Sequence, residues 1–359
     1  MNKTVKFAIV GCGVIGKLHA KQLSQIDSAE LVGFADIIPA RADNYAAEFG
    51  GKPYYDYRQM LSQTDADVIS ICTPSGLHGE MTIEAAQHGK HVIVEKPMDI
   101  KLEVAMAMTK ACREAGVKLA CIFQHRFDPA TRKVKEFIDS NRFGKLVMIN
   151  AHVHWYRSNA YYASGDWRGT WALDGGGVLM NQAIHTIDLM QYLGGPVRQL
   201  TAMTANLLHP TIEVEDVASA TVEFTNGAIG AFTATTCAYP GLTTRVEIFG
   251  ENGSCIIEND KLVYQHFAAN EDSGTHGLNY TESNQVSEEE EDQDSPDVRA
   301  RIYGNSHYYQ FLDFIEALQQ DRDPMVTGEE GQRALELVLA MYQSAQRQQP
   351  VTLPLLETK

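Results

Sequence analysis

The sequence lacks three features that would assign it to a class at once. No apolar run approaches the roughly 20 residues that a membrane-spanning helix needs. The six cysteines are scattered without a C-x-x-C pair, which is typical of reduced thiols in a cytoplasmic protein and argues against a disulfide framework or a zinc site. Positive charge is in deficit, since 30 Lys and Arg face 46 Asp and Glu, so neither a nucleic acid nor an anionic membrane surface is an expected partner.

The length and composition of the chain are typical of a soluble globular protein of two domains. The chain has 359 residues, of which 44% are hydrophobic and 21% charged. Half of the net charge of −16 lies between Glu282 and Asp297, where eight acidic residues occur without a Lys or Arg. We therefore expect residues 265–305 to be an acidic insertion that is mobile or becomes ordered only with a ligand or a neighbour.

The first third of the chain alternates between strand and helix patterns. Short β-rich apolar runs are typical of buried parallel strands, and they occur at Val5–Val10, Leu31–Ala35, Val68–Cys72, His91–Val94 and Lys118–Ile122. Helical patterns separate them at 40–49, 78–88 and 102–115. Because successive β-α-β crossovers are right-handed, the pattern predicts a doubly wound α/β domain over residues 1–123.

The pattern then changes to long runs of strands. We expect helices at 129–140 and 178–193, and strands at 145–153, 197–206, 217–224, 228–236, 245–249 and 254–258. Asn226-Gly227 between two of these strands is a hairpin signal. Residues 124–359 are therefore predicted to form an α+β domain with a largely antiparallel sheet, closed by helices within 307–348.

A glycine-rich turn directly after the first strand is the most informative motif. Gly11, Gly13 and Gly16 form G-x-G-x-x-G before a predicted helix over 14–25. Gly11 permits the tight bend, Gly13 lets the backbone approach a pyrophosphate, and Gly16 lets helix and strand pack closely. The helix N-terminus offers free N–H groups to that pyrophosphate. The motif predicts dinucleotide binding.

The second strand favours NAD over NADP. Asp36 ends this strand 20 residues after Gly16, where a carboxylate binds the adenosine ribose diol. Its charge would repel a 2′-phosphate. Arg41 lies close enough in the sequence to weaken that preference.

Two further strand ends carry polar residues. Thr73, Pro74 and His78 follow the fourth strand, and Glu95-Lys96-Pro97 follows the fifth. In a doubly wound sheet these carboxyl ends surround the nicotinamide end of a dinucleotide. Lys96 is therefore expected at the reaction centre, although a solvent-exposed loop lysine before a proline is the ordinary alternative.

A polar helix face follows a run of glycines in the second domain. Asn181, His185 and Asp188 are spaced at i, i+4 and i+7. A histidine has the pKa range to accept a proton from an alcohol while hydride leaves the same carbon. Asn is a weak zinc ligand and no third ligand has metal spacing, so no metal site is predicted. A buried core or capping histidine is the alternative that the sequence leaves open.

Aromatic and arginine residues gather between residues 155 and 171. Tyr156, Trp167 and Arg168 belong to this glycine-bounded segment. Aromatic faces pack against the C–H surfaces of sugars, and the guanidinium fork recognises carboxylate or phosphate. An aromatic core cluster with surface arginines explains half of these residues equally well.

Together these motifs resemble the Gfo/Idh/MocA (glucose-fructose oxidoreductase / inositol dehydrogenase / rhizopine catabolism) oxidoreductases. The resemblance rests on the glycine turn with His19, Thr73-Pro74 with His78, Glu95-Lys96-Pro97, Gly175-Gly-Gly with His185 and Asp188, and the stretch from His307 to Ala334. It implies a Rossmann domain, an α/β domain whose open sheet packs against another subunit in a homodimer or homotetramer, and NAD(H) or NADP(H). It also implies hydride transfer to or from a sugar, polyol or sugar derivative.

The resemblance also implies roles for individual residues. Lys96 would polarise the reacting oxygen and His185 would act as general acid and base. Substrate contacts would come from Asn181, Arg168, Tyr156 and Asp188. Cofactor contacts would come from Gly11, Gly13, Val14, Ile15, Gly16, Asp36, Arg41, Thr73, Pro74, His78, Glu95, Lys96, Trp167 and Arg168.

Asn181 departs from the family pattern. Many members have an aspartate there, and an amide can orient a substrate hydroxyl but cannot stabilise an imidazolium by charge. The Asn-Gln-x-x-His form, with Trp-Arg-Gly-Thr upstream, is similar to the branch that oxidises nucleotide-linked amino-sugar uronates at C3. Two alternatives stay open: a glycoside hydrolase that oxidises C3 transiently with bound NAD, and a dinucleotide-sensing regulator without catalysis.

Overall fold

The computed structural model describes residues 4–268 and 306–356 and divides the chain into two compact units. The first unit holds the described residues up to Gln124, residues 171–175 and the described residues between 300 and 335. The remaining described residues form the second unit. The sequence predicted one division after residue 123, whereas the units interleave, and helix α10 (Ser306–Gln320) belongs to the first unit.

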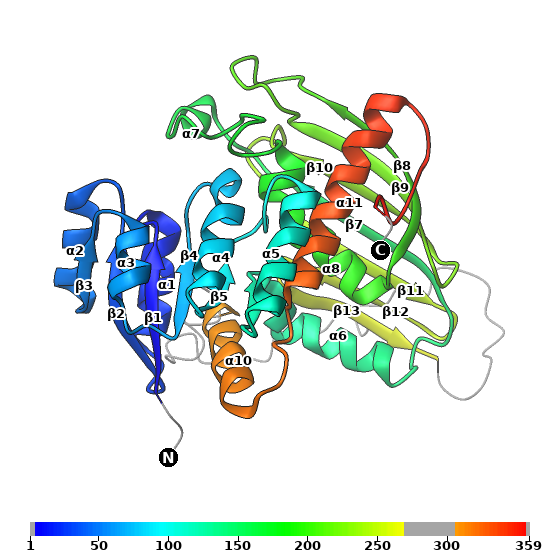
Figure 1. The fold of residues 1–359 in the computed structure, drawn as a ribbon. Coiled ribbons are helices and arrows are strands. Elements are labelled where there is room, and N and C mark those ends of the chain that lie inside the picture. The colour runs from blue at the N-terminus through cyan, green and yellow to red at the C-terminus, as the bar shows by residue number, and fades with distance from the viewer. Residues whose placement is uncertain (1–3, 269–305, 357–359) are drawn as a thin grey trace. The chain divides into compact units, whose positions relative to one another are not determined.

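The first unit is built on a six-stranded parallel sheet in the order β3-β2-β1-β4-β5-β6 (Figure 1). Its strands are β1 (Val5–Val10), β2 (Ala29–Ala35), β3 (Lys52–Tyr54), β4 (Val68–Ile71), β5 (His91–Val94) and β6 (Leu119–Cys121). This strand order is that of a doubly wound dinucleotide-binding sheet, which confirms the predicted fold class. The predicted strands lie within about a residue or two of their observed bounds, and only the short β3 was missed.

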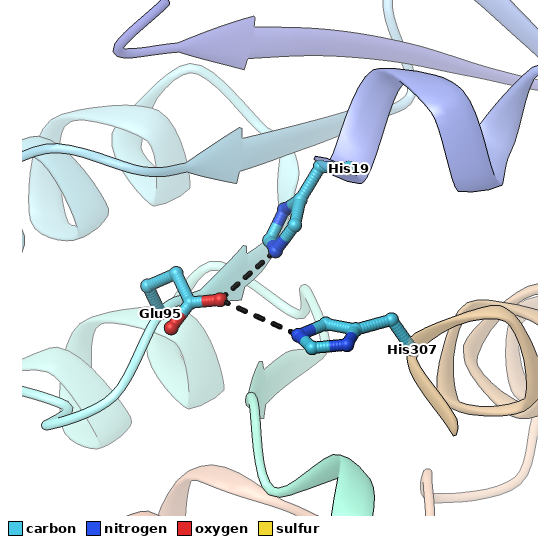
Figure 2. A group of neighbouring side chains, drawn as sticks. All are labelled: His19, Glu95 and His307. Atoms are coloured by element: carbon cyan, nitrogen blue, oxygen red, sulfur yellow. Dashed lines mark hydrogen bonds and ion pairs between the residues drawn. The ribbon is translucent and has the colours of Figure 1, made fainter. Parts of the chain in front are cut away.

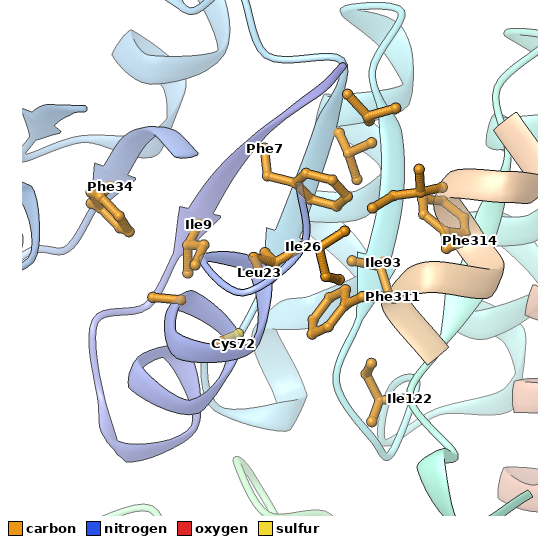
Figure 3. Close-up of a cluster of buried hydrophobic side chains, with 14 of the residues drawn as sticks. Phe7, Ile9, Leu23, Ile26, Phe34, Cys72, Ile93, Ile122, Phe311 and Phe314 are labelled. Carbon is orange, nitrogen blue, oxygen red and sulfur yellow. The ribbon is translucent and has the colours of Figure 1, made fainter. Parts of the chain in front are cut away.

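Helices cover this sheet and close its core. They are α1 (Val14–Leu23), α2 (Pro39–Phe49), α3 (Tyr57–Gln63), the single turn η1 (Ser75–Leu77), α4 (His78–Gln87) and α5 (Leu102–Glu114). Alternate β1 residues point into a fully buried cluster with α1, α2 and α10 (Figure 3). Phe7 of β1 meets Phe311 of α10 edge to face at 6.2 Å. Helix α10 begins more than 180 residues after β6 ends, and it is nevertheless part of the core of the first unit.

The second unit contains an eight-stranded mixed sheet in the order β13-β12-β11-β7-β10-β9-β8-β14 (Figure 1). Its strands are β7 (Leu146–His154), β8 (Val197–Ala205), β9 (Val217–Phe224), β10 (Ile229–Thr235), β11 (Thr244–Gly250), β12 (Gly253–Glu258), β13 (Lys261–Phe267) and β14 (Val351–Thr352). All its pairings are antiparallel except that of β7 with β10. The predicted α+β domain with a largely antiparallel open sheet is confirmed.

In the part of the chain that the structure describes, helices cover one face of this sheet and leave the other open. The helical segments are η2 (Gln124–Phe127), α6 (Pro129–Asp139), α7 (Asn159–Tyr162), η3 (Val178–Gln182), α8 (Ile184–Gly194) and the C-terminal part of α11 (Gly328–Arg347), whose residues 328–335 belong to the first unit. Helix α8 packs on β7 and β11, and alternate β7 residues such as Ile149 and Val153 are buried. Met148, Met203 and Ile229 are exposed, with Met203 at 77%. Buried apolar residues and more exposed residues thus alternate along the strands, as is typical of a sheet with one packed face and one exposed face.

Two expectations are modified. The helix predicted over 178–193 is two segments, because η3 is a wide π turn that ends before α8 begins at Ile184. Strand β13 occupies the beginning of the predicted acidic insertion, and residues 269–305 lie outside the described residues. Within residues 4–268 and 306–356, no helix combines the length and hydropathy of a membrane span.

Candidate active site

The glycine turn between β1 and α1 has room for glycine alone at two of its three positions. Gly11 has a φ of +95°, and a Cβ there would meet the carbonyl oxygen of Cys72 at 2.6 Å. A Cβ on Gly16 would meet the carbonyl oxygen of Gly11 at 2.1 Å. A Cβ on Gly13 would meet nothing within 4 Å, so the backbone there is open to a ligand. This is the arrangement a pyrophosphate requires at a helix N-terminus.

Asp36 and Tyr45 hold this turn in shape. The Asp36 carboxylate accepts hydrogen bonds from the Cys12 N–H at 2.9 Å and the Ile38 N–H at 2.8 Å. The Tyr45 hydroxyl donates to the Gly13 carbonyl at 2.5 Å. Asp36 thus lies beside the turn as predicted. The contact of Tyr45 was not predicted, although the position of Tyr45 on the apolar face of the expected helix indicated that its ring would be buried. Arg41 is exposed on α2.

These residues fit a bound dinucleotide. Gly11, Gly13, Gly16 and the exposed first turn of α1, where Val14 is 94% exposed and Ile15 is partly buried, would hold the pyrophosphate. Asp36 would hold the adenosine ribose.

His78 joins the other two strand-end loops of the first unit. One ring nitrogen lies 2.9 Å from the carbonyl oxygen of Pro97 and the other 2.8 Å from that of Thr73. Burial lowers the pKa of His78, and its bonds to these carbonyls oppose that effect. His78 therefore fixes the spacing between the loop of Thr73 and Pro74 and that of Glu95 and Lys96, while its predicted cofactor contact stays a prediction.

Glu95 lies between two histidines from distant parts of the chain (Figure 2). Its Oε1 is 2.9 Å from His19 Nε2 on α1 and 3.9 Å from His307 Nε2 on α10. Its Oε2 accepts a hydrogen bond from the Lys96 backbone N–H at 3.0 Å. The carboxylate is thus the direct support of the Lys96 backbone.

This cluster is a buried ion pair. Burial opposes charge on His19, but Cys72 and Glu95 outweigh it and raise the pKa of His19 to about 10. Burial also opposes charge on Glu95, and hydrogen bonds from His19 and His307 hold the pKa of Glu95 well below its usual range. Glu95 is therefore a carboxylate and His19 an imidazolium at neutral pH.

In the second unit, Glu215 supports the turn that carries the predicted substrate residues. It accepts hydrogen bonds from the N–H of Gly177 at 3.0 Å, the N–H of Leu179 at 2.9 Å and the Tyr342 hydroxyl at 2.8 Å. A Cβ on Gly177 would meet the Glu215 carbonyl oxygen at 1.8 Å. Burial raises the pKa of Glu215 to about 7. No pattern in the sequence indicated Glu215 or Tyr342 as supports of this turn.

The π turn η3 carries Asn181, three residues before α8 begins at Ile184. The Asn181 N–H bonds the Gly177 carbonyl, and the Ala183 N–H bonds the Val178 carbonyl at 2.8 Å. The wide turn thus lies between Val178 and Ala183, and Asn181 and His185 are both partly exposed. Wide turns of this kind occur frequently at functional sites.

Arg168 is connected to this turn through Tyr161. Its guanidinium donates to the Tyr161 hydroxyl at 2.7 Å and lies over the rings of Tyr161 and Trp167, at 4.4 Å from each centroid. The Gln182 side-chain amide donates to the same hydroxyl at 3.2 Å. The aromatic and arginine segment thus lies beside the turn of Asn181. Tyr161 and Gln182 were not among the predicted residues.

Two other predicted residues have packing partners. Tyr156 meets Tyr239 edge to face at 5.1 Å. Asp188 is buried and binds the Arg126 guanidinium through both carboxylate oxygens, at 2.8 and 2.6 Å. Their substrate contacts stay predictions.

Three groups of described residues bring metal-ligand atoms within 4.8 Å of one another. They are His19, Glu95 and His307; His209, Asp216 and Cys237; and His125, Asp128 and Asp260. In each group a histidine nitrogen is 2.7 to 2.9 Å from a carboxylate oxygen. Hydrogen bonding within each group accounts for these distances.

Comparison with known proteins covers both halves of the chain. Residues 5–123 match the GFO_IDH_MocA model for the oxidoreductase family's NAD-binding Rossmann fold. Residues 135–353 match the model for that family's C-terminal alpha/beta domain.

Individual relatives are oxidoreductases. The chain is 34% identical to the WlbA dehydrogenase from Bordetella pertussis, whose crystal structure is a complex with NADH and UDP-GlcNAcA; the TM-score is 0.85, over 99% of this chain and 100% of that one. It is 28% identical to scyllo-inositol 2-dehydrogenase (NAD(+)) of Bacillus subtilis over 98% of this chain and 97% of that protein. It is 32% identical to the uncharacterized oxidoreductase YrbE of Bacillus subtilis over 73% of this chain and 76% of that protein.

Proposed function

The chain belongs to the Gfo/Idh/MocA family of oxidoreductases, and we propose that it oxidises C3 of a nucleotide-linked amino-sugar uronate with NAD as hydride acceptor. It is an NAD(P)-dependent dehydrogenase of the sugar and polyol class. The substrate, the carbon and the preference for NAD are the proposed part.

The observation that carries the proposal is the connection of Arg168 to the turn of Asn181. A stacked guanidinium forms paired hydrogen bonds with a carboxylate or a phosphate, and a UDP-linked uronate has both. Tyr161 and Gln182 tie that guanidinium to the segment that also leads into His185. The similarity to the WlbA dehydrogenase crystallised with UDP-GlcNAcA supports the same substrate class.

In this proposal the reaction needs one base and one cation from the protein. His185 accepts the proton of the substrate hydroxyl as the C–H bond breaks. Lys96 places its ammonium against the same oxygen and stabilises the negative charge that develops there. Bound NAD supplies the acceptor for the hydride. Asn181 orients the hydroxyl by hydrogen bonding, because its amide carries no charge to share with His185.

Asp36 supports NAD over NADP. Its carboxylate is already fixed by the N–H groups of Cys12 and Ile38, so it cannot turn away from a 2′-phosphate without losing both bonds. We therefore expect NAD to be used at least tenfold more efficiently than NADP, and the Asp36→Ser variant to lose most of that preference.

The open face of the second sheet supports a homodimer or homotetramer. Exposed Met148, Met203 and Ile229 lie on strands of this sheet, and apolar side chains on an open sheet face are typical of an interface. Light scattering of the purified chain and of Met203→Lys tests this assembly. We also propose that the protein acts in the cytoplasm.

The test of function is turnover of UDP-GlcNAcA by the purified full chain with NAD. We expect NADH to accumulate and the substrate to lose two hydrogens in the mass spectrum, with NMR placing the new carbonyl at C3. UDP-GlcNAc, which lacks the carboxylate, is the matched control and should react far more slowly.

Three results would contradict the proposal. Equal rates with both sugars would remove the role of the carboxylate, and a carbonyl at another carbon would refute C3 oxidation. Release of the nucleotide without net NADH would show transient oxidation followed by elimination.

A further inference from the structure

His125 lies between two carboxylates in the second unit. Its Nδ1 is 2.7 Å from Asp128, at the start of α6, and 3.3 Å from Asp260, in the turn between β12 and β13. Both residues of that turn, Asn259 and Asp260, have positive φ, so the hairpin geometry itself aims Asp260. Helix α6 packs against α8 and β13, which brings these three elements together (Figure 1).

The two carboxylates keep His125 positively charged. Burial opposes the charge, but the bonds to Asp128 and Asp260 outweigh it and raise the pKa of His125 to about 10. The same bond lowers the pKa of Asp260. The group therefore contains an imidazolium at neutral pH.

The ring of His125 lies directly against the ring of His185. Their centroids are 5.2 Å apart and their planes nearly perpendicular, at 84°. The next residue, Arg126, binds Asp188 one turn further along α8 through two hydrogen bonds. The segment from His125 to Arg126 is thus attached to the same helix as the proposed base, and its geometry is fixed by a buried ion pair.

We propose that His125 is a positioning residue whose fixed positive charge keeps the neighbouring His185 imidazole neutral and able to accept a proton. The catalytic part of this inference rests on the proposed function, whereas the electrostatic coupling between the two rings does not. In this chain, where Asn181 supplies no carboxylate, the coupling favours the free base of His185 over its imidazolium.

The charged groups around the pair give the direction of the effect. Asp128 and Asp260 contact His125, His185 contacts it from α8, and Arg126 is neutralised by Asp188. Replacing His125 by glutamine removes the cation and leaves both carboxylates. Loss of the cation favours protonation of His185, and at this separation a unit charge moves a pKa by about one unit.

Hydrogen–deuterium exchange at the imidazole C2 position tests the coupling in the full chain without substrate. Its rate follows the protonation state, and mass spectrometry of the peptide that contains residue 185 gives the midpoint for that one histidine. We expect His125→Gln to raise the His185 midpoint by about one pH unit. His125→Arg, which keeps the charge, should leave the midpoint where it is, and exposed His88 serves as an internal control.

The pH profile of kcat/KM then tests the role in the reaction. In His125→Gln the acid limb should move up by about one unit, so that the rate falls about tenfold near pH 6 and converges with the parent near pH 9. His125→Arg should restore the parent profile.

Two exchange results would overturn the inference. One is a His185 midpoint that stays within a few tenths of a unit in His125→Gln, and the other is an equal shift in the glutamine and arginine variants, which would indicate a change of shape. If the exchange shift occurs but no sugar nucleotide is oxidised, the coupling stands and the proposed function fails.

Discussion

Two buried glutamates support the two loops that carry the proposed chemistry, and their pKa values move in opposite directions. Glu95 and Glu215 are both 5% exposed, and each accepts a hydrogen bond from the backbone of its loop. Glu95 faces His19 and His307, and its pKa is lowered. Glu215 faces N–H groups and the Tyr342 hydroxyl, and its pKa is raised to about 7.

The difference shows that burial alone does not determine the charge of a carboxyl group. Neutral donors offset only part of the desolvation of Glu215, whereas the imidazolium of His19 more than offsets that of Glu95. The first loop is therefore held by a permanent ion pair, and the second by a group that changes charge near neutral pH. His125 in the second unit is the converse case, an imidazole between two carboxylates.

The largest effect is expected from Glu95→Leu. The substitution leaves the buried His19 without its carboxylate, which typically costs about 3–5 kcal/mol of unfolding free energy. Urea denaturation at pH 7 measures this loss. Glu215→Leu removes no ion pair and should cost less, about 1–3 kcal/mol, because it leaves donors such as the Gly177 N–H unsatisfied.

Equal losses in the two leucine variants would contradict the contrast between the glutamates. Glu95→Gln is the matched control, since it keeps an acceptor for the Lys96 N–H and should lie between the parent and Glu95→Leu.

The second prediction tests whether the chemistry assigned to Lys96 is independent of the support that Glu95 gives to the loop. Lys96→Met removes the ammonium but leaves Glu95 and the backbone N–H in place, so the unfolding free energy should stay within about 0.5 kcal/mol of the parent. The value of kcat should fall about 10²–10³-fold, as when one electrostatic donor to a developing oxyanion is lost. NAD affinity, measured by calorimetry, should change little. Retention of kcat would remove Lys96 from the reaction.

The third effect concerns pH. The pKa of Glu215 is about 7 in the folded chain against an ordinary value of 4.5, so its contribution to stability is complete below pH 4.5 and is lost as the pH rises through 7. This loss amounts to at most about 3 kcal/mol. Relative to the parent, Glu215→Gln should therefore gain stability between pH 4.5 and 8.

The titration of Glu95 should leave the corresponding curve for Glu95→Gln flat over this pH range. Glu95 contributes stability above pH 4.5, and this contribution is lost only as the pH falls through its lowered pKa. Urea denaturation of both variants over pH 4.5–8 gives the two difference curves. Parallel curves would show that the two glutamates titrate alike.

The first domain was largely readable from the sequence because its information is local. The apolar runs at Val5–Val10 and His91–Val94 coincide with β1 and β5. The roles of Gly11 and Gly16 follow from a motif six residues long. In contrast, no local pattern placed α10 in the first core, because the contact of Phe7 with Phe311 joins residues 304 apart.

The supports of the site were not readable for the same reason. Glu95 and His307 are 212 residues apart, and Glu215 lies 38 residues after Gly177. The π turn at Val178–Gln182 was read as part of a regular helix, because its apolar residues fit helical spacing and only its hydrogen bonds reveal the wide turn. The geometry of the glycine turn could thus be predicted from the sequence, whereas the buried ion pairs and carboxyl groups that support the loops could not.

The smallest effect should come from Asp260→Asn, which tests how much Asp260 contributes to keeping His125 protonated. Asp260 is 53% exposed and 3.3 Å from His125, whereas Asp128 is 8% exposed and 2.7 Å away. Solvent screens the outer pair, so its loss should cost less than about 1 kcal/mol of stability. Asp128 alone should keep His125 protonated, and the exchange midpoint of His185 should stay within about half a pH unit of the parent. A larger rise, comparable to that of His125→Gln, would show that Asp260 in the hairpin turn, and not Asp128 at the start of α6, keeps His125 protonated beside the proposed base.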